Sequence, residues 1–332
     1  MPYSCLRMIS EQSAEWQYYG STWEVPGHAD RGASDVLRYA AAFMGACPSV
    51  ESYADFIVFK NKQFVERHGL GGLYHDWTVP VRCRNEAHGC GWRDADGKLQ
   101  GRYPIFAARD LYRRIYAMLK DQPHETFMMG HMSARVLIPM LSFCDAYLDG
   151  EQFRRRVTDD YTEALPLDAF RAEFMGKQWG VIPYFLPELA SEAQKEPAPT
   201  RHLLSLTLLH DTPVWAIWCN SATVAKVREA LDEFEYADAE FLGYWDNGAW
   251  LSCEQEDVKV SAYRREGRAL LVVSNLSAEA QKVSLKVNLE ELGVPGAAAR
   301  NAETGEAIPL ENGTITVGMP RRDLALIRLD AP

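Results

Sequence analysis

The sequence predicts an α/β protein: a (β/α)8-type TIM barrel that lacks its first strand, followed by a C-terminal antiparallel β-sandwich. Up to Trp218, short apolar runs alternate with helical stretches, which is the pattern of parallel βα units. After Trp250, short segments alternate apolar and polar residues between turn signals, which is typical of a sandwich. We therefore expect a barrel domain over residues 1–250 and a sandwich domain over residues 251–332.

The composition limits the classes of partner. The chain has 332 residues, of which 47% are hydrophobic and 24% charged, as in ordinary globular proteins. No apolar run approaches the roughly 20 residues that span a bilayer, so no membrane partner is predicted. The net charge of -11 opposes binding to phosphate backbones, so no nucleic-acid partner is predicted. The oligomeric state is left open.

Seven barrel strands can be placed on the sequence. If the third of them is counted as strand four of eight, the first strand is absent, and we expect an upstream segment to supply it. Helices are expected at 53–67, 105–119, 200–210 and 222–234. The expected strands are Tyr3–Ile9, Arg38–Gly45, Gly71–Asp76, Thr126–His131, Cys144–Asp149, Ala169–Phe174 and Val214–Trp218.

Asp76 is the first candidate catalytic residue. Active sites of (β/α) barrels gather at the C-terminal ends of the strands, and Asp76 closes the fourth strand. Its neighbours His75 and Trp77 are expected to contact substrate. Alternatively, Asp76 caps the following loop or pairs with an arginine.

Asp149 is the second candidate, at the end of the sixth strand. Strand alternation places it on one face with Asp145, and Gly150 lets the backbone turn after it. Asp145 is either a substrate ligand or an interior polar residue. Glu151 binds either a sugar hydroxyl or an arginine.

Two carboxyl groups at one barrel mouth suit glycoside hydrolysis. One of them protonates the leaving group while the other attacks the sugar or activates water. We expect Asp76 as nucleophile and Asp149 as acid/base, facing one cleft. The separation of roughly 5 to 5.5 Å found in retaining enzymes is favoured over the roughly 6.5 to 9.5 Å of inverting ones.

Further side chains are candidates for substrate binding. His131 ends the fifth strand, where it binds a sugar hydroxyl or serves the fold. Trp218 closes the eighth strand and can stack on a sugar ring. Arg171 and Glu173 share a face of the expected seventh strand, either in the site or as a structural ion pair.

The loop after Asp76 carries Cys83, His88 and Cys90. These residues allow a zinc site, a local disulfide or an ordered loop with free thiols. We predict no metal, because a structural zinc site usually has four ligands at tighter spacing. Arg82, His88 and Trp92 can line the sugar site from this loop. No P-loop or dinucleotide fingerprint is present, so no cofactor is predicted.

Several motifs resemble the catalytic domains of glycoside hydrolase family 123. They are Cys47-Pro-Ser49, Ser52-Tyr-Ala-Asp-Phe56, Gly72-Leu-Tyr-His-Asp76, His88-Gly-Cys-Gly-Trp92, Ala146-Tyr-Leu-Asp-Gly-Glu151 and Phe170-Arg-Ala-Glu-Phe174. The resemblance implies a glycosidase acting on N-acetylgalactosamine glycosides, with an adjacent Asp-Glu pair and the substrate's acetamido group as nucleophile. In this sequence Gly150 separates Asp149 from Glu151, which departs from that pattern.

The strand-four and strand-six aspartates and the C-terminal sandwich also resemble retaining α-glycosidases of the α-galactosidase type. The sequence therefore favours a retaining glycoside hydrolase acting on carbohydrate. Two alternatives stay open. One is a substrate-assisted N-acetylhexosaminidase mechanism, and the other is a non-catalytic carbohydrate-binding barrel or an inactive truncated glycosidase.

Overall fold

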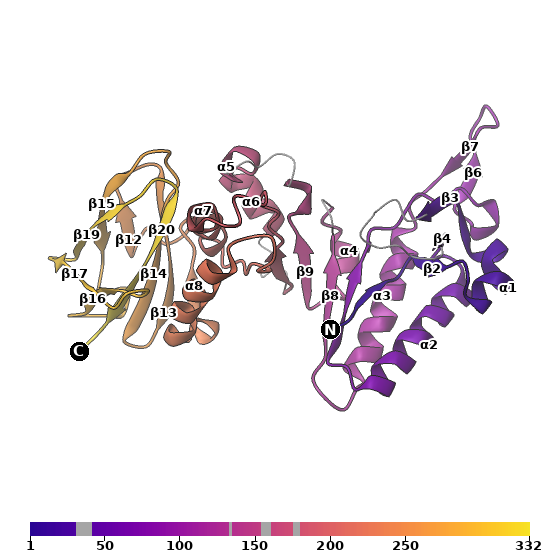
Figure 1. The fold of residues 1–332 in the computed structure, drawn as a ribbon, viewed down its shortest axis with the longest axis horizontal. Coiled ribbons are helices and arrows are strands. Elements are labelled where there is room, and N and C mark those ends of the chain that lie inside the picture. The colour runs from indigo at the N-terminus through magenta and orange to yellow at the C-terminus, as the bar shows by residue number, and fades with distance from the viewer. Residues whose placement is uncertain (31–41, 133–134, 154–160, 175–179) are drawn as a thin grey trace. The chain divides into compact units, whose positions relative to one another are not determined.

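The computed structural model describes residues 1–30, 42–132, 135–153, 161–174 and 180–332 (Figure 1). The chain divides into two compact units. Unit 1 comprises residues 1–149 and 177–182, and unit 2 comprises residues 150–176 and 183–332. Within the described ranges, no helix combines the length and the apolar character needed to cross a membrane.

Unit 1 is built on a parallel sheet with the strand order β1-β5-β8-β9. The N–H of Ile182 donates to the carbonyl of Asp145 at the end of this sheet. Its elements are β1 (Tyr3–Cys5), β2 (Met8–Ser10), α1 (Ala14–Trp23), β3 (Glu24–Asp30), β4 (Phe43–Ala46), α2 (Glu51–His68), β5 (Gly72–Asp76), η1 (Glu86–His88), β6 (Gly91–Arg93), β7 (Leu99–Gly101), α3 (Ile105–Lys120), β8 (Phe127–His131), α4 (Ile138–Leu141) and β9 (Ala146–Asp149).

One face of this sheet is packed against helices. Leu73, Met128 and Tyr147, from three neighbouring strands, share a core with Leu111 and Ile115 of α3. Helices α2 and α3 lie side by side (Figure 1). Because side chains alternate along a strand, the residues between these apolar positions face away from α3. The helices predicted at 53–67 and 105–119 are confirmed as α2 and α3.

The predicted second and third strands need correction. Tyr3–Ile9 is two strands, of which β1 pairs in parallel with β5 and β2 pairs antiparallel with β4. Of Arg38–Gly45, residues 38–41 lie outside the described residues, and residues 43–45 belong to β4 in the antiparallel sheet β2-β4-β3. With β5 as strand four, β1 therefore takes position three, and no described strand fills positions one and two.

Unit 2 contains a helical layer and the predicted sandwich. The sandwich has a six-stranded sheet, β11-β13-β14-β20-β16-β17, and a four-stranded sheet, β12-β15-β19-β18. Its first strand is β11, which precedes residue 251, where the sequence predicts the domain boundary. The division into domains 1–250 and 251–332 stays a prediction. Its elements are η2 (Glu151–Phe153), α5 (Tyr161–Ala164), α6 (Leu167–Phe174), β10 (Ile182–Phe185, whose first residue belongs to unit 1), α7 (Pro197–Leu208), α8 (Ser221–Phe234), η4 (Tyr236–Asp238), β11 (Glu240–Leu242), β12 (Leu251–Cys253), β13 (Val258–Arg265), β14 (Arg268–Asn275), β15 (Gln281–Val287), β16 (Ala298–Asn301), β17 (Ala307–Ile308), β18 (Leu310–Glu311), β19 (Thr314–Met319) and β20 (Asp323–Asp330).

The expected seventh strand, Ala169–Phe174, is wrong, because these residues form helix α6. Phe170 and Phe174 are four residues apart and stack on one helix face, with ring centroids 4.7 Å apart. The segment that does form a strand is β10. Of the expected eighth strand, the described contact is a single parallel bridge between Val214 and Phe185.

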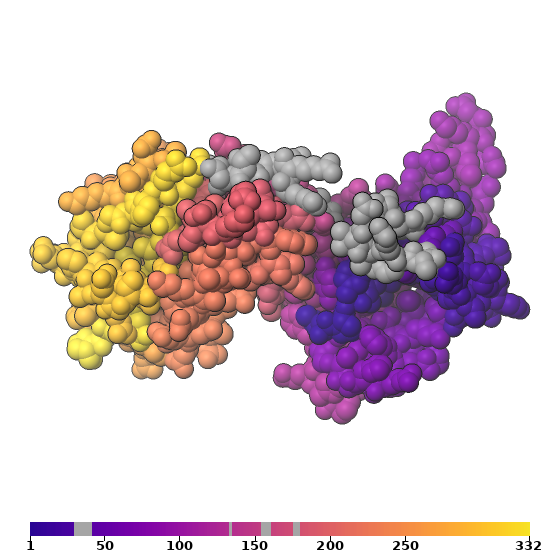
Figure 2. Space-filling view, viewed as in Figure 1, coloured from indigo at the N-terminus to yellow at the C-terminus, as the bar shows by residue number. Residues whose placement is uncertain are grey.

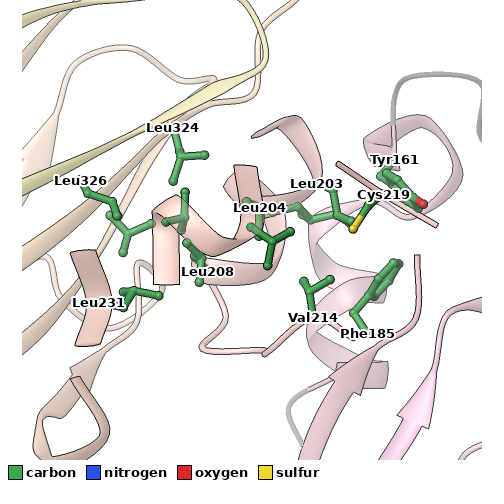
Figure 3. Close-up of a cluster of buried hydrophobic side chains, with 14 of the residues drawn as sticks. Tyr161, Phe185, Leu203, Leu204, Leu208, Val214, Cys219, Leu231, Leu324 and Leu326 are labelled. Atoms are coloured by element: carbon green, nitrogen blue, oxygen red, sulfur yellow. The ribbon is translucent and has the colours of Figure 1, made fainter. Parts of the chain in front are cut away.

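Helix α7 lies at the centre of unit 2. Figure 3 shows Leu204 and Leu208 of this helix among Leu324 and Leu326 of β20 and Leu231 of α8. In Figure 2 the orange segment containing α8 lies directly against the yellow strands. This contact joins the helical layer and the sandwich into one hydrophobic core.

Sandwich side chains also bond to the backbone of α7. The hydroxyl of Ser274 donates to the carbonyl of Ser205 at 2.7 Å. The hydroxyl of Ser261 donates to the carbonyl of Leu209, at the C-cap of α7, at 2.8 Å. These bonds satisfy carbonyl groups at the buried C-terminal end of the helix, where intrahelical partners are lacking.

We expect Phe170→Ala to destabilise the protein by about 3–5 kcal/mol. Phe170 is fully buried and packs against Phe174, Phe185 and His210, so truncation leaves a cavity. The measurement is urea unfolding followed by circular dichroism. Phe106→Ala is the control, because Phe106 is 77% exposed and its loss should cost about 0.5 kcal/mol or less. Equal losses in the two variants would contradict the assignment of α6 to the core.

Candidate active site

Asp76 is the last residue of β5, and two neighbouring strands supply its partners. Nδ1 of His131, at the end of β8, lies 3.0 Å from Oδ1. The hydroxyl of Tyr3 in β1 donates to Oδ2 at 2.5 Å, and the N–H of Trp77 donates to Oδ1 at 2.7 Å. The parallel register of the three strands therefore fixes both oxygens of this carboxyl group.

The carboxyl group of Asp76 is held in its charged form. Burial raises the pKa of Asp76, but the hydrogen bonds from His131 and Tyr3 outweigh burial and bring the pKa below its ordinary value. Asp76 is therefore a carboxylate at neutral pH. A charged carboxylate can act as a nucleophile but cannot donate a proton.

His131 and Tyr74 form the rest of this polar group. The hydroxyl of Tyr74 lies 2.9 Å from Nδ1 of His131, the same nitrogen that faces Asp76. Tyr74 and Tyr3 pack together with ring centroids 5.6 Å apart. His131 is thus brought to Asp76, and its contact with a sugar stays a prediction.

His75 and Asp145 both make structural contacts, which differs from the substrate contact expected of His75 and fits one of the two roles expected of Asp145. His75 is fully buried, packs against Tyr112 of α3 and contacts the hydroxyl of Ser4 at 2.6 Å. Burial lowers the pKa of His75 to about 3, so it is neutral. The physical reason is alternation, because His75 points to the opposite face from Asp76.

Asp145 makes a set of structural contacts at the start of β9. Its carboxylate accepts bonds from Lys120 of α3 at 2.9 Å and from the N–H of Met128 at 2.7 Å. These contacts join α3, β8 and β9. The alternative interpretation, an interior polar residue, fits this environment.

Asp149 ends β9 at the same edge of the sheet as Asp76, but the register places the two side chains on opposite faces of the sheet. Leu148 pairs with His131, and Tyr147 pairs with Gly130. Asp149 therefore belongs to the series of Tyr147, which packs toward α3, and it is fully buried. The register is at odds with the expectation that both aspartates face one cleft.

The turn after Asp149 requires glycine, as expected. Gly150 has a φ of 130°, which side-chain-bearing residues rarely adopt. A Cβ atom there would lie 2.5 Å from the carbonyl oxygen of Leu186. The chain can turn sharply at this point because the residue lacks a side chain.

The loop after β5 has two exposed tryptophans. Trp77 is 37% exposed, with the guanidinium of Arg7 4.7 Å from its ring centroid, and Trp92 of β6 is 47% exposed. Arg82 donates to the carbonyl of Gly101 at 2.9 Å, which ties the loop together. His88 contacts Cys83, as analysed below. Trp77, Trp92 and Arg82 are exposed in this loop, and Arg82 and His88 also hold it together, so the contact of these residues with a sugar stays a prediction.

Unit 2 contributes a hollow of about 560 Å³. Glu151, Glu188 and Trp218 are among its lining residues. Trp218 adopts a φ of 54° and is 47% exposed, so its ring is open to solvent. The hollow brings together Glu151 and Trp218, which the sequence nominated separately. Glu188 was not predicted, because no motif surrounds it.

Arg171 and Glu173 do not share a face, because they are two residues apart on helix α6. The guanidinium of Arg171 lies 4.8 Å from the ring centroid of Trp245. Glu173 accepts a hydrogen bond from Nε2 of Gln152 at 2.5 Å. The expectation that Arg171 and Glu173 share a face of a strand is therefore wrong. The contact of these two residues with substrate stays a prediction.

We expect Tyr3→Phe to raise the pKa of Asp76. The variant removes one of the two side-chain hydrogen bonds that lower this pKa and leaves the ring in place. The pKa is measured by NMR titration of the aspartate carboxyl carbons, assigned by comparison with Asp76→Asn. Tyr18→Phe is the control, since Tyr18 is 78% exposed and remote in the chain from Asp76. An unchanged or lowered pKa in Tyr3→Phe would show that the bond is not made in solution.

Comparison with known proteins gives a domain match over part of the chain and a similarity of fold. Residues 223–305 match the model of the glycoside hydrolase 123 C-terminal domain. No curated protein matches the sequence. Among solved structures, a maltogenic α-amylase from Thermotoga neapolitana is similar with a TM-score of 0.61 at 12% identity, covering 99% of this chain and 77% of that one.

Two further structures are similar at the level of the fold. An α-amylase from Lactobacillus plantarum has a TM-score of 0.60 at 10% identity, covering 98% of this chain and 77% of that one. A family 27 β-L-arabinopyranosidase from Geobacillus stearothermophilus has a TM-score of 0.53 at 13% identity, covering 87% of this chain and 64% of that one. The fold is thus of the (β/α) barrel type with a C-terminal β domain, as predicted. Residues 223–305 are therefore similar to the C-terminal domain found in glycoside hydrolase family 123.

Proposed function

We propose that this chain is a retaining glycosidase in which Asp76 is the nucleophile. The observation that carries the proposal is the environment of Asp76: a carboxylate at the C-terminal end of a parallel strand, with a lowered pKa and bonded to Tyr3 and His131. Barrel enzymes place catalytic groups at this edge. A nucleophilic carboxylate must be charged at neutral pH, and this one is.

The reaction has two steps. An oxygen of Asp76 forms a bond to the anomeric carbon while the glycosidic bond breaks, and an acid donates a proton to the leaving oxygen. Water then attacks the anomeric carbon and gives its proton to the same acid/base residue, and the bond to Asp76 breaks. Tyr3 and His131 hold the Asp76 carboxylate and stabilise its charge before the attack and after its release.

The acid/base residue is proposed from two candidates. Asp149 is the one that strand position nominates, since it ends β9. Glu151 follows two residues later, is partly exposed and lines the hollow with Trp218. A proton donor must reach the glycosidic oxygen. Asp149 is completely buried and Glu151 is partly exposed, so the two candidates are separated by the variants below.

The proposed substrate class is a pyranoside. The exposed rings of Trp77, Trp92 and Trp218 can stack on the apolar faces of sugar rings. The similar structures are α-amylases and a β-L-arabinopyranosidase, so hexopyranosides and pentopyranosides are the first sugars to test. The family 123 match adds N-acetylhexosaminides, through the substrate-assisted alternative. Hydrolysis confined to N-acetylated glycosides would favour that alternative.

We expect Asp76→Asn to lower hydrolysis of aryl glycosides at least about 10³-fold, because the amide cannot form the glycosyl ester. The assay is aryl release across a panel of α- and β-glycosides. Glu254→Gln, an exposed change in the sandwich, is the control and should retain full activity. Binding of sugars by the wild type without any hydrolysis would instead support a carbohydrate-binding barrel.

We expect Glu151→Gln to lower hydrolysis of poor leaving groups by about 10²–10⁴-fold and, for activated ones such as dinitrophenyl glycosides, to spare the first step and slow only the attack of water on the bond to Asp76. An activated leaving group needs no proton. Azide should restore turnover of the activated substrate by forming a glycosyl azide with retained configuration. The matched comparison is Asp149→Asn. If Asp149→Asn shows this pattern and Glu151→Gln does not, Asp149 is the acid/base.

A further inference from the structure

A second cluster of reactive side chains lies in unit 1, away from the carboxylates. Cys47 follows β4, whereas Cys83, His88 and Cys90 come from the loop between β5 and α3. The three cysteines are buried together with Val25. The fold thus brings a fourth candidate ligand, Cys47, to the three that the sequence grouped in one loop.

The ligand atoms of Cys47, Cys83 and His88 lie at distances close to those of a tetrahedral metal site, and Cys90, which lies outside this group of three, adjoins it through Cys47. One ligand atom from each of Cys47, Cys83 and His88 lies within 4.8 Å of the other two. Sγ of Cys83 is 3.4 Å from Nδ1 of His88, and Sγ of Cys47 is 3.9 Å from Sγ of Cys90. With bonds of about 2.3 Å to sulfur and about 2.0 Å to nitrogen, tetrahedral zinc places sulfur pairs about 3.8 Å apart and sulfur–nitrogen pairs about 3.5 Å apart.

The histidine is oriented as a metal ligand would be. Nε2 of His88 lies 2.7 Å from the carbonyl oxygen of Thr22. Nδ2 of Asn85 is 3.0 Å from the same nitrogen, but a carbonyl oxygen can only accept, so the shorter contact assigns the ring proton to Nε2. The lone pair of Nδ1 then faces Sγ of Cys83. A second ring nitrogen bonded to a backbone carbonyl is the usual support of metal-binding histidines.

A disulfide explains this cluster less well. It would join two sulfur atoms about 2.05 Å apart and would leave the third cysteine and the histidine unused. All seven cysteines of the chain are described and are free thiols here. Cys219 and Cys253, which are outside the cluster, belong to unit 2.

We propose that Cys47, Cys83, His88 and Cys90 form a structural zinc site. Three thiolates and one imidazole complete a tetrahedral Cys₃His set, which is typical of structural zinc and leaves no open position for catalysis. The thiols lose their protons to solvent on binding, and no redox change occurs. The metal joins the loop after Asp76 to the segment before α2, and through Thr22 to the end of α1.

The first experiment measures zinc in the full chain, purified without chelator, by inductively coupled plasma mass spectrometry. We expect about one zinc ion per chain. Cys47→Ser and His88→Ala should each lower the zinc content at least about tenfold, and His88→Cys should retain it as a Cys₄ site. Cys253→Ser is the matched control and should keep full zinc, because Cys253 lies in the sandwich and bonds to Gln255.

The second experiment identifies the ligands even if a serine variant fails to fold. Protein grown with cobalt(II) should show the intense d–d bands of tetrahedral thiolate coordination. In His88→Cys the sulfur-to-cobalt charge-transfer band should gain intensity, because a thiolate replaces the imidazole. An unchanged spectrum in that variant, wild-type protein without metal, or a Cys47–Cys90 disulfide in peptide mass spectra would overturn the proposal. This outcome is independent of glycoside hydrolysis.

Discussion

The parallel pairing of β5 with β1 and β8 is the constraint on which the candidate active site depends. Pairing in register brings the ends of three strands to one edge, so that Tyr3 and His131 flank Asp76. None of these residues is close to the other two in sequence. The charge on Asp76 is therefore a property of the sheet, because its stabilising bonds come from the neighbouring strands.

The sequence predicted the parts of this arrangement that lie within one strand. Asp76, His131 and Asp149 end strands as expected, since apolar runs and following turn residues are local signals. Tyr3 was missed as a partner of Asp76, because strand neighbours cannot be identified from one sequence. The face of Asp149 also depends on register, which sets every side chain of a strand to one side or the other.

Elsewhere, local patterns were ambiguous. Phe170 and Phe174 are four residues apart, a spacing that places both rings on one face of a strand and also on one face of a helix. Their packing against Phe185 decides for the helix. Cys47 is a comparable case, since its distance along the chain from Cys83 hides a contact that only the fold creates. Long-range packing therefore supplied what the sequence alone could not.

The burial of α7 has a consequence for how this architecture can be recombined. Leu203 to Leu208 are all buried, and Ser261 and Ser274 of the sandwich bond to the backbone of the helix and its C-cap. The sandwich is thus not a portable module joined by a linker. Grafting residues 251–332 onto another enzyme would uncover an apolar face on both fragments, so exchange between proteins should transfer α7 and the sandwich together.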